Sequence, residues 1–156
     1  MKNYTSYDLI EWGKPFEKSQ HALPEPTLSE VLIRVTAAGL CHSDLHVQKG
    51  YMDLGEEGKL TFAERGAQLP MTFGHEIAGI VEAIGDKVKN VSIGQQVLVF
   101  PWIGCGDCLA CNEDRESDCS AMRIIGLKQK GGFATHCLIE NEKFLANIDG
   151  LDAAEV

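Results

Sequence analysis

The amino-acid sequence predicts a mainly β fold with short helices. Several β-branched segments lie between glycine or proline residues, which is typical of strands separated by turns. Four of the six cysteines fall in one short stretch, which indicates a loop that leaves the core. The chain has 156 residues, of which 44% are hydrophobic, so a single domain can bury a core without disulfides.

The first predicted strand covers residues 31–37, and a short helical segment follows it. The strand is β-branched and partly alternating, and Pro24 and Pro26 discourage a helix before it. A predicted turn at residues 38–41 leads into the helical segment at residues 42–46. Within that segment Ser43 and His46 are three positions apart and share one face.

A long loop and three further strands are predicted next. Residues 50–70 are charged and dotted with glycine, without a clear period, so we expect a functional or mobile loop. The remaining expected elements are strands at residues 77–84, 95–100 and 133–140, turns at Gly85-Asp86, Gly94 and Gly131-Gly132, and the first turn of a helix at residues 151–156. The sequence contains no internal repeat.

The charge balance excludes one class of partner. The chain has 14 basic and 23 acidic residues and a net charge of -9, so polyanions are repelled and nucleic acid is not an expected ligand. Residues 1–12 lack the apolar core of a signal peptide, and no stretch approaches the roughly 20 apolar residues that cross a bilayer. We therefore expect a soluble, cytoplasmic protein without a membrane partner.

Four closely spaced cysteines predict a structural zinc site. Cys105, Cys108, Cys111 and Cys119 would supply the four thiolates of a tetrahedral Cys₄ shell. Gly104 and Gly106 would let the backbone fold tightly enough for neighbouring sulfurs to face one ion. The alternatives are buried or disulfide-paired cysteines, which a reducing compartment disfavours, and a nucleic-acid-binding zinc ribbon, which the acidic composition disfavours.

Cys41 and His75 are candidates for a second zinc site. Each lies at the end of a predicted strand beside polar residues, and one thiolate and one imidazole make up half of a catalytic zinc shell. Catalytic sites commonly use three protein ligands and leave one position for water or substrate. Taken singly, Cys41 also fits a small core residue and His75 a hydrogen-bonded structural histidine.

Three motifs together resemble those of zinc-dependent medium-chain alcohol dehydrogenases. The segment Gly74-His75-Glu76-x2-Gly79-x5-Gly85-x2-Val88 resembles the zinc signature of that family, and Cys41-His42-Ser43-Asp44-x-His46 resembles the motif of its first ligand. The four-cysteine cluster has the spacing of the family's structural zinc loop. The resemblance extends from about residue 31 to residue 140, with a lengthened loop at residues 51–69 that we expect to cover the pocket mouth.

The resemblance implies a fold and a domain order. Residues 1–150 would form a GroES-like β-barrel catalytic domain with a structural zinc lobe. Residues 151–156 would begin the connection to a nucleotide-binding Rossmann domain that is absent from this chain. No Gly-x-Gly-x-x-Gly follows a strand here, and the third ligand of the catalytic zinc would also lie beyond residue 156. We expect Cys137 to be an ordinary buried strand residue rather than that ligand.

The resemblance also implies roles for the residues around the catalytic zinc. Cys41 and His75 would be its ligands, and Glu76 would lie close to the metal. Ser43 would hydrogen-bond the alcohol oxygen, and His46 would pass the proton to solvent. Without the motif, Ser43 would be interpreted as a helix cap, His46 as an exposed polar residue and Glu76 as a solvated charge.

Three further residues have implied roles. Asp44 would orient His75 by accepting its free ring N–H. His42 would face the pyrophosphate of the cofactor. Trp102 would form an aromatic wall of the substrate pocket, although a tryptophan beside a strand also fits plain core.

Two functions follow. The first is the catalytic portion of a zinc-dependent alcohol dehydrogenase, with one structural and one catalytic zinc, that oxidises an alcohol to an aldehyde or ketone by hydride transfer to NAD or NADP. Its partners would be small-molecule alcohols, aldehydes or ketones, and the full-length protein would be a homo-oligomer, a dimer or tetramer. The isolated chain would be inactive. The second is a stand-alone zinc-binding module without catalysis.

Overall fold

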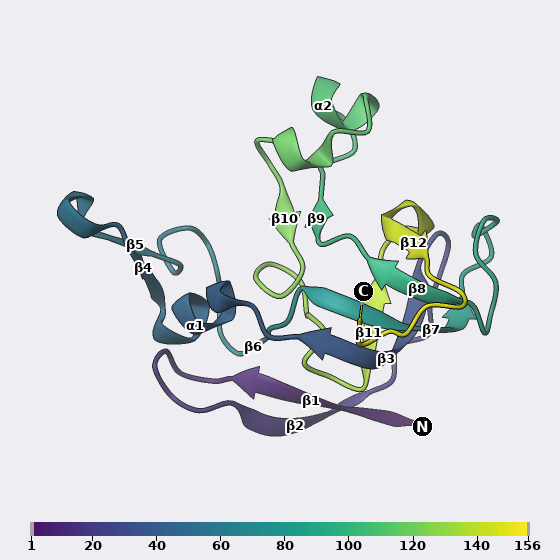
Figure 1. The fold of residues 1–156 in the computed structure, drawn as a ribbon, viewed down its shortest axis with the longest axis horizontal. Coiled ribbons are helices and arrows are strands. Elements are labelled where there is room, and N and C mark those ends of the chain that lie inside the picture. Colours follow the sequence, from purple (N-terminus) through teal and green to yellow (C-terminus); the bar gives the residue numbers. More distant parts are fainter. Residues whose placement is uncertain (1, 156) are drawn as a thin grey trace.

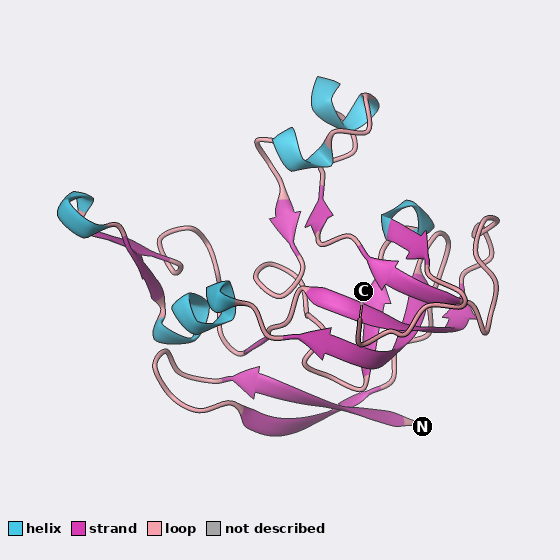
Figure 2. Ribbon diagram, viewed as in Figure 1, coloured by secondary structure: helices cyan, strands magenta, loops and turns pink. Residues whose placement is uncertain are grey.

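A computed structural model describes residues 2–155 and confirms the mainly β class. Its largest sheet has five antiparallel strands in the order β11-β3-β7-β8-β12 (Figures 1 and 2). The strands are β3 (Val31–Gly39), β7 (Glu76–Ile84), β8 (Gln96–Val99), β11 (His136–Ile139) and β12 (Leu145–Asn147). Their inward side chains pack into one core, which includes Ile33, Ile77 and Val97 at 0% exposure.

A second, three-stranded sheet has the order β2-β1-β6. Its strands are β1 (Asn3–Leu9), β2 (Glu17–Ala22) and β6 (Met71–Thr72), and none of the three was predicted from the sequence. Backbone hydrogen bonds from Tyr7 N to Phe133 O and from Thr135 N to Thr5 O, both 2.8 Å, join β1 to the segment before β11. The two sheets are therefore connected along this seam.

A helix and a hairpin follow β3. Helix α1 (His42–Lys49) confirms the predicted helical segment and extends it, and Val47 packs with Leu9, Phe62 and Phe73 in a second apolar cluster. The predicted loop at residues 50–70 is wrong in part, because it contains the hairpin β4 (Tyr51–Asp53), η1 (Gly55–Glu57) and β5 (Lys59–Thr61), which projects from the body (Figure 1). Strands of three residues are too short to show an alternating pattern in the sequence.

The cysteine-rich segment forms a lobe that stands away from both sheets (Figure 1). Strands β9 (Trp102–Ile103) and β10 (Arg123–Ile124) pair at its base, and it carries α2 (Leu109–Asn112) and η2 (Glu116–Asp118). A last short helix, η3 (Glu142–Phe144), lies between β11 and β12. None of the helices in the described part of the chain is long and apolar enough to cross a membrane.

The boundaries of some predicted elements change. The predicted last strand at residues 133–140 is paired only over His136–Ile139, because the residues before it bond to β1 and to the segment around Phe73 instead. Within residues 151–155 there is no helix but a turn, closed by Glu155 N to Asp152 O at 3.0 Å. Val156, the end of the predicted helical turn, lies outside the described residues.

Candidate metal centres and the cleft beside them

Cys41 lies where β3 passes into α1 and is the residue at the N-terminal cap of that helix. Its backbone N–H donates to Asp44 Oδ2 at 2.9 Å, which satisfies one of the amide groups at the helix start. Asp44 is 3% exposed, so this carboxylate is held inside the protein. The helix start thus fixes the direction in which the Cys41 side chain leaves the backbone.

His75 reaches the same carboxylate from the other side. Its Nδ1 is 3.5 Å from Asp44 Oδ1, and its Nε2 is 3.3 Å from Ser43 Oγ. Gly74 precedes it with φ 91°, and a Cβ there would lie 2.9 Å from Phe133 N, so a glycine is needed for this approach. The Asp44 hydrogen bond, opposed by burial and assisted by Cys41, raises the pKa of His75 to about 9.

Glu76 completes a group of three possible ligands. The donor atoms of Cys41, His75 and Glu76 all lie within 4.8 Å of one another. Gly39 pairs with Glu76 between β3 and β7, and a Cβ on Gly39 would overlap Glu76 Oε2 and lie 3.0 Å from Glu76 Cβ. Hydrogen bonds from Ser43, and then from His75, lower the pKa of Cys41. A thiolate, an imidazole and a carboxylate at this separation fit a zinc ion.

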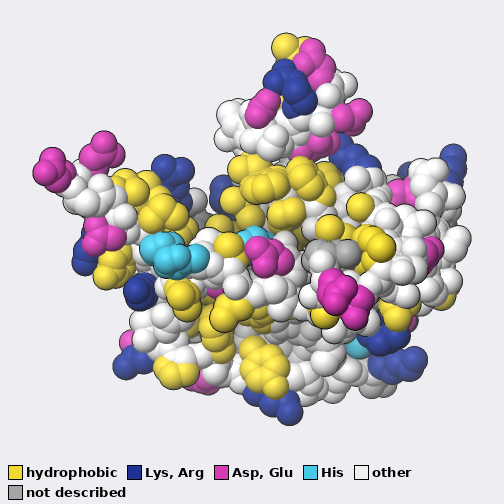
Figure 3. Space-filling view, in the orientation of Figure 1, with side chains coloured by type: hydrophobic (Ala, Val, Ile, Leu, Met, Phe, Trp, Pro, Cys, Tyr) yellow, Lys and Arg dark blue, Asp and Glu magenta, His cyan; other side chains and the backbone are white. Residues whose placement is uncertain are grey.

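A cleft of about 880 Å³ opens beside these ligands. Ser43 and Trp102 line it with the three ligand residues, and Ala78, Leu98 and Val99 supply apolar surface. Trp102 is 40% exposed and packs edge-on against Phe100 at 5.3 Å between ring centroids. In the space-filling view, hydrophobic side chains gather on the face below the cysteine-rich lobe (Figure 3).

His42 and His46 do not line the cleft. They lie one helical turn apart on α1, with stacked rings whose centroids are 4.9 Å apart and whose planes differ by 8°. His42 is exposed and His46 is half-buried. The structure therefore places Ser43 in the cleft lining, Asp44 in the protein interior and the two histidines outside the cleft lining.

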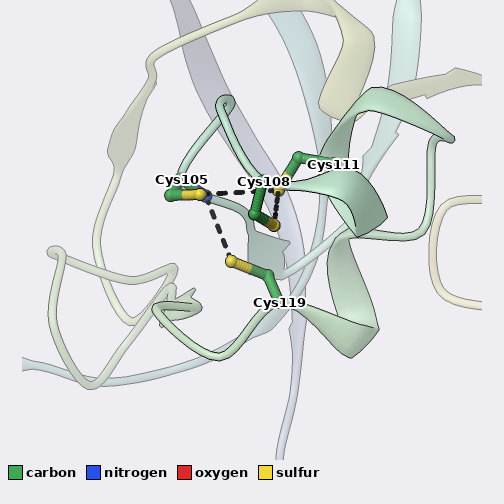
Figure 4. Close-up of side chains that lie close together, drawn as sticks. All are labelled: Cys105, Cys108, Cys111 and Cys119. Carbon is green, nitrogen blue, oxygen red and sulfur yellow. Dashed lines mark hydrogen bonds between the residues drawn. The ribbon is translucent and has the colours of Figure 1, made fainter.

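The four cysteines of the lobe converge (Figure 4). Their sulfurs all lie within 4.8 Å of one another, with Cys108 Sγ to Cys111 Sγ at 3.5 Å and Cys105 Sγ to Cys111 Sγ at 3.9 Å. Sulfurs bound tetrahedrally to zinc at about 2.3 Å would be about 3.8 Å apart. None of the four forms a disulfide in the structure. The donor set fits a closed Cys₄ zinc site.

The thiols of the lobe differ in acidity. Backbone N–H groups of Asp107 and Cys108 lower the pKa of Cys105 to about 6. The backbone N–H of Gly106 lowers the pKa of Cys111, but burial and the neighbouring thiols outweigh it and raise the pKa to about 11. Thiols bind zinc as thiolates, so a zinc ion at this cluster would favour the ionised form of all four cysteines, including Cys111.

Glu116 and Lys143 support the lobe and were not predicted. Glu116 is 7% exposed, and its carboxylate accepts from Lys143 in η3, which lowers the pKa of Glu116. A Cβ on Gly104 would lie 2.4 Å from Cys111 Sγ and 2.7 Å from Glu116 Cγ, so a glycine here leaves room for both side chains. The position of Glu116 between Cys111 and Cys119 is the feature of the sequence that could have indicated this role.

Cys137 takes no part in either centre. It is 4% exposed on β11, its Sγ donates to the Lys130 carbonyl at 3.5 Å, and burial raises its pKa to about 12. The interpretation of Cys137 as a buried strand residue is confirmed.

Comparison with known proteins finds dehydrogenases both among related sequences and among solved structures. An NAD-dependent alcohol dehydrogenase from Sulfurisphaera tokodaii is 40% identical over 148 residues, which cover 94% of this chain and 41% of that protein. The crystal structure of the D-arabinose dehydrogenase from Sulfolobus solfataricus matches with a TM-score of 0.80 and 29% identity, covering 98% of this chain and 42% of that one. A cobalt- and zinc-bound thermostable alcohol dehydrogenase from Pyrobaculum aerophilum matches with a TM-score of 0.80 and 25% identity, covering 99% and 45%.

The chain thus spans about two fifths of the length of the relatives it matches. A family model described as the alcohol dehydrogenase GroES-like domain matches residues 27–149, which include both groups of candidate ligands. On this match, and on the fold it shares with the solved dehydrogenases, the chain belongs to the alcohol dehydrogenase GroES-like domain family.

Proposed function

We propose that these residues form the catalytic domain of a zinc-dependent alcohol dehydrogenase, which oxidises a small alcohol to an aldehyde or ketone with NAD or NADP. The observation that carries the proposal is the convergence of Cys41, His75 and Glu76 beside a cleft. Family membership and similarity to an NAD-dependent alcohol dehydrogenase support it. The 156 residues contain no Gly-x-Gly-x-x-Gly, so we propose that the nicotinamide cofactor binds mainly through residues outside them.

Two zinc ions belong to the proposal. Cys41 and His75, with Glu76 in reach, would hold a catalytic zinc, and Cys105, Cys108, Cys111 and Cys119 would hold a structural zinc. When bound, the catalytic zinc would lower the pKa of the alcohol hydroxyl, and the nicotinamide would accept a hydride from the alcohol carbon.

The protein residues position the alcohol and move its proton. Asp44 holds the His75 ring by its Nδ1 side and leaves Nε2 toward the cleft. Ser43 Oγ, beside that Nε2, would accept the hydroxyl proton, and its own proton would leave by way of His46 to solvent. Trp102 would contact the carbon chain of the alcohol, and His42 would face the cofactor pyrophosphate.

A substitution at Ser43 tests the proposed reaction. In a polypeptide that joins these residues to a nicotinamide-binding domain, Ser43→Ala should lower kcat about 100-fold, because the hydroxyl is needed while the proton leaves. The Kd for the nicotinamide should change less than about twofold. The matched control is Ser117→Ala, at an exposed serine of η2. Unchanged kcat at saturating alcohol would remove Ser43 from the relay.

Metal removal tests the two proposed zinc sites. A weak chelator should remove the zinc at Cys41 and His75 first and leave the Cys₄ zinc, because the closed thiolate shell contributes folding free energy. Native mass spectrometry during the titration should show two separate losses, and simultaneous loss would contradict the assignment. Two zincs without turnover in the joined polypeptide would favour a zinc-binding module.

We also propose that the full-length enzyme is a homo-oligomer, a dimer or a tetramer. Light scattering would measure its mass in solution.

A further inference from the structure

A second cavity lies between the two sheets, and the candidate metal centres do not use it. It has a volume of about 370 Å³, within the range of pockets that hold small ligands. Leu32, Cys137 and Leu138, from β3 and β11, supply apolar surface. Its polar side chains are Tyr4 from β1, His21 from β2, His136 from β11, and Lys130 from the loop before β11.

Lys130 brings a positive charge to this cavity without a carboxylate partner. Its Nζ is 3.3 Å from Tyr4 Oη and 3.3 Å from His21 Nδ1. Among residues 2–155 Lys130 forms no ion pair within 4.0 Å. Neither contact is a carboxylate, so the ammonium charge remains available to an anion.

The nearby carboxylates are engaged elsewhere. Asp8, 4% exposed, accepts from Thr72 Oγ1 at 2.6 Å and lies 3.1 Å from His21 Nε2. An ammonium can only donate, so in the contact with Lys130 the His21 Nδ1 is the acceptor and Nε2 faces Asp8.

Glu82, which contacts the lining residue His136, is engaged in the same way. It contacts His136 Nε2 at 3.3 Å and Arg34 Nε at 3.7 Å. Among the residues that the structure describes, no carboxylate lines the cavity or pairs with the Lys130 ammonium.

Tyr4 supplies a second donor at the same place. The residue is 8% exposed, and its ring lies 5.2 Å from the His21 ring and 6.3 Å from the His136 ring, measured between centroids. Since the Tyr4 oxygen accepts from Lys130, its own hydrogen is left to be donated. An ammonium and a phenol O–H thus meet at the side of a partly apolar cavity.

We propose that this cavity binds a small organic anion, a monocarboxylate with a short apolar chain, whose carboxylate bonds Lys130 and Tyr4 while its chain lies against Leu32 and Leu138. The polar end recognises the charge, and the apolar surface favours a short alkyl chain over a hydrated inorganic anion. The site is separate from the proposed zinc centres and stands whether or not the protein is a dehydrogenase.

An NMR titration of the zinc-loaded 156-residue chain with sodium butyrate tests the proposal, at constant ionic strength. Amide shifts should saturate at residues 4, 21, 22, 130 and 136–138, with a Kd in the millimolar range. Butylamine, with the same chain and the opposite charge, should not produce them. Lys130→Met should raise the Kd about tenfold and Tyr4→Phe at least about threefold, the size expected for a lost charged and a lost neutral hydrogen bond. Lys18→Met, at an exposed lysine of β2, is the matched control and should leave the Kd unchanged.

Shifts around Cys41 and His75 report carboxylate at the proposed zinc and should persist in Lys130→Met, so the two sites are distinguished. Three outcomes would overturn the proposal: no saturable shifts at the cavity, an unchanged Kd in Lys130→Met, or equal binding of butylamine. If Lys130→Met does not fold, Lys130→Gln provides the same comparison.

Discussion

At the scale of single residues, Asp44 joins the two sides of the candidate zinc centre. One carboxylate oxygen accepts from the backbone of Cys41, and the other faces the ring of His75. Two possible ligands that are 34 positions apart in the sequence are therefore held by one buried side chain. A group that orients metal ligands commonly affects metal affinity without touching the metal.

Replacement of this carboxylate should weaken the open site selectively. We predict that Asp44→Asn lowers zinc affinity at Cys41 and His75 about 10- to 100-fold, because the ring and the helix start lose a charged acceptor. The Cys₄ zinc should be unaffected. Competition with a chromophoric chelator measures both affinities, and Asp86→Asn, at an exposed turn, is the control. Equal affinities in Asp44→Asn and wild type would contradict the role of Asp44.

At the scale of elements, Asp8 connects the strands of the three-stranded sheet. Burial raises its pKa, but hydrogen bonds from Thr72, Ser19, Ser6 and His21 outweigh burial and lower the pKa below its ordinary value. A group with a lowered folded pKa stabilises the fold above its unfolded pKa, about 3.9, and loses that contribution as the pH falls through the folded pKa.

The stability of this sheet should therefore depend on pH through Asp8. We predict that Asp8→Asn lowers the free energy of unfolding by about 1–3 kcal/mol at pH 7. The difference from wild type should shrink as the pH falls below about 4. Urea denaturation at several pH values measures it, with Asp86→Asn as the control. A difference independent of pH would show that packing, not charge, is responsible.

The projecting hairpin depends on glycine at one position. Gly58 has φ 90° and ψ -147°, a conformation that only glycine adopts readily, and Leu54 N donates to its carbonyl at 2.8 Å. We predict that Gly58→Ala opens the hairpin β4–β5 at a cost of about 1–3 kcal/mol. Faster hydrogen exchange confined to residues 51–61 would show it. Gly55→Asn is the control, because φ 68° at that position is accessible to asparagine.

At the scale of the whole molecule, a partly buried ion pair links the cysteine-rich lobe to the segment between β11 and β12. Glu116 is on the lobe and Lys143 is in η3, beside the core residue Phe144. We predict that Glu116→Gln accelerates zinc release from the four cysteines about tenfold, because the lobe loses its ion pair with Lys143. Stopped-flow release to a chelator measures the rate. Glu113→Gln, at an exposed carboxylate of the same lobe, should release zinc at the wild-type rate.

The sequence alone determined those features whose residues are close along the chain. The four cysteines converge as predicted, because they lie within fifteen consecutive positions that form a single loop, with Gly104 and Gly106 at its start. The strands at 31–37 and 77–84 were predicted correctly because long, β-branched segments between turns carry a strong local pattern. Strands β1 and β2 were not predicted, because β1 buries the polar residues Ser6 and Asp8 and β2 has no β-branched run.

Tertiary structure alone decided the contacts between distant segments. Gly39 makes room for the Glu76 carboxylate, and Lys130 meets Tyr4 and His21 across 126 and 109 positions, which no local pattern encodes. Strand pairing also decided the positions of Ser43 and His46, because β3 delivers the start of α1 to the cleft and leaves the next turn outside it. Local spacing specifies which residues are able to act together, whereas the register of the sheets determines which of them meet.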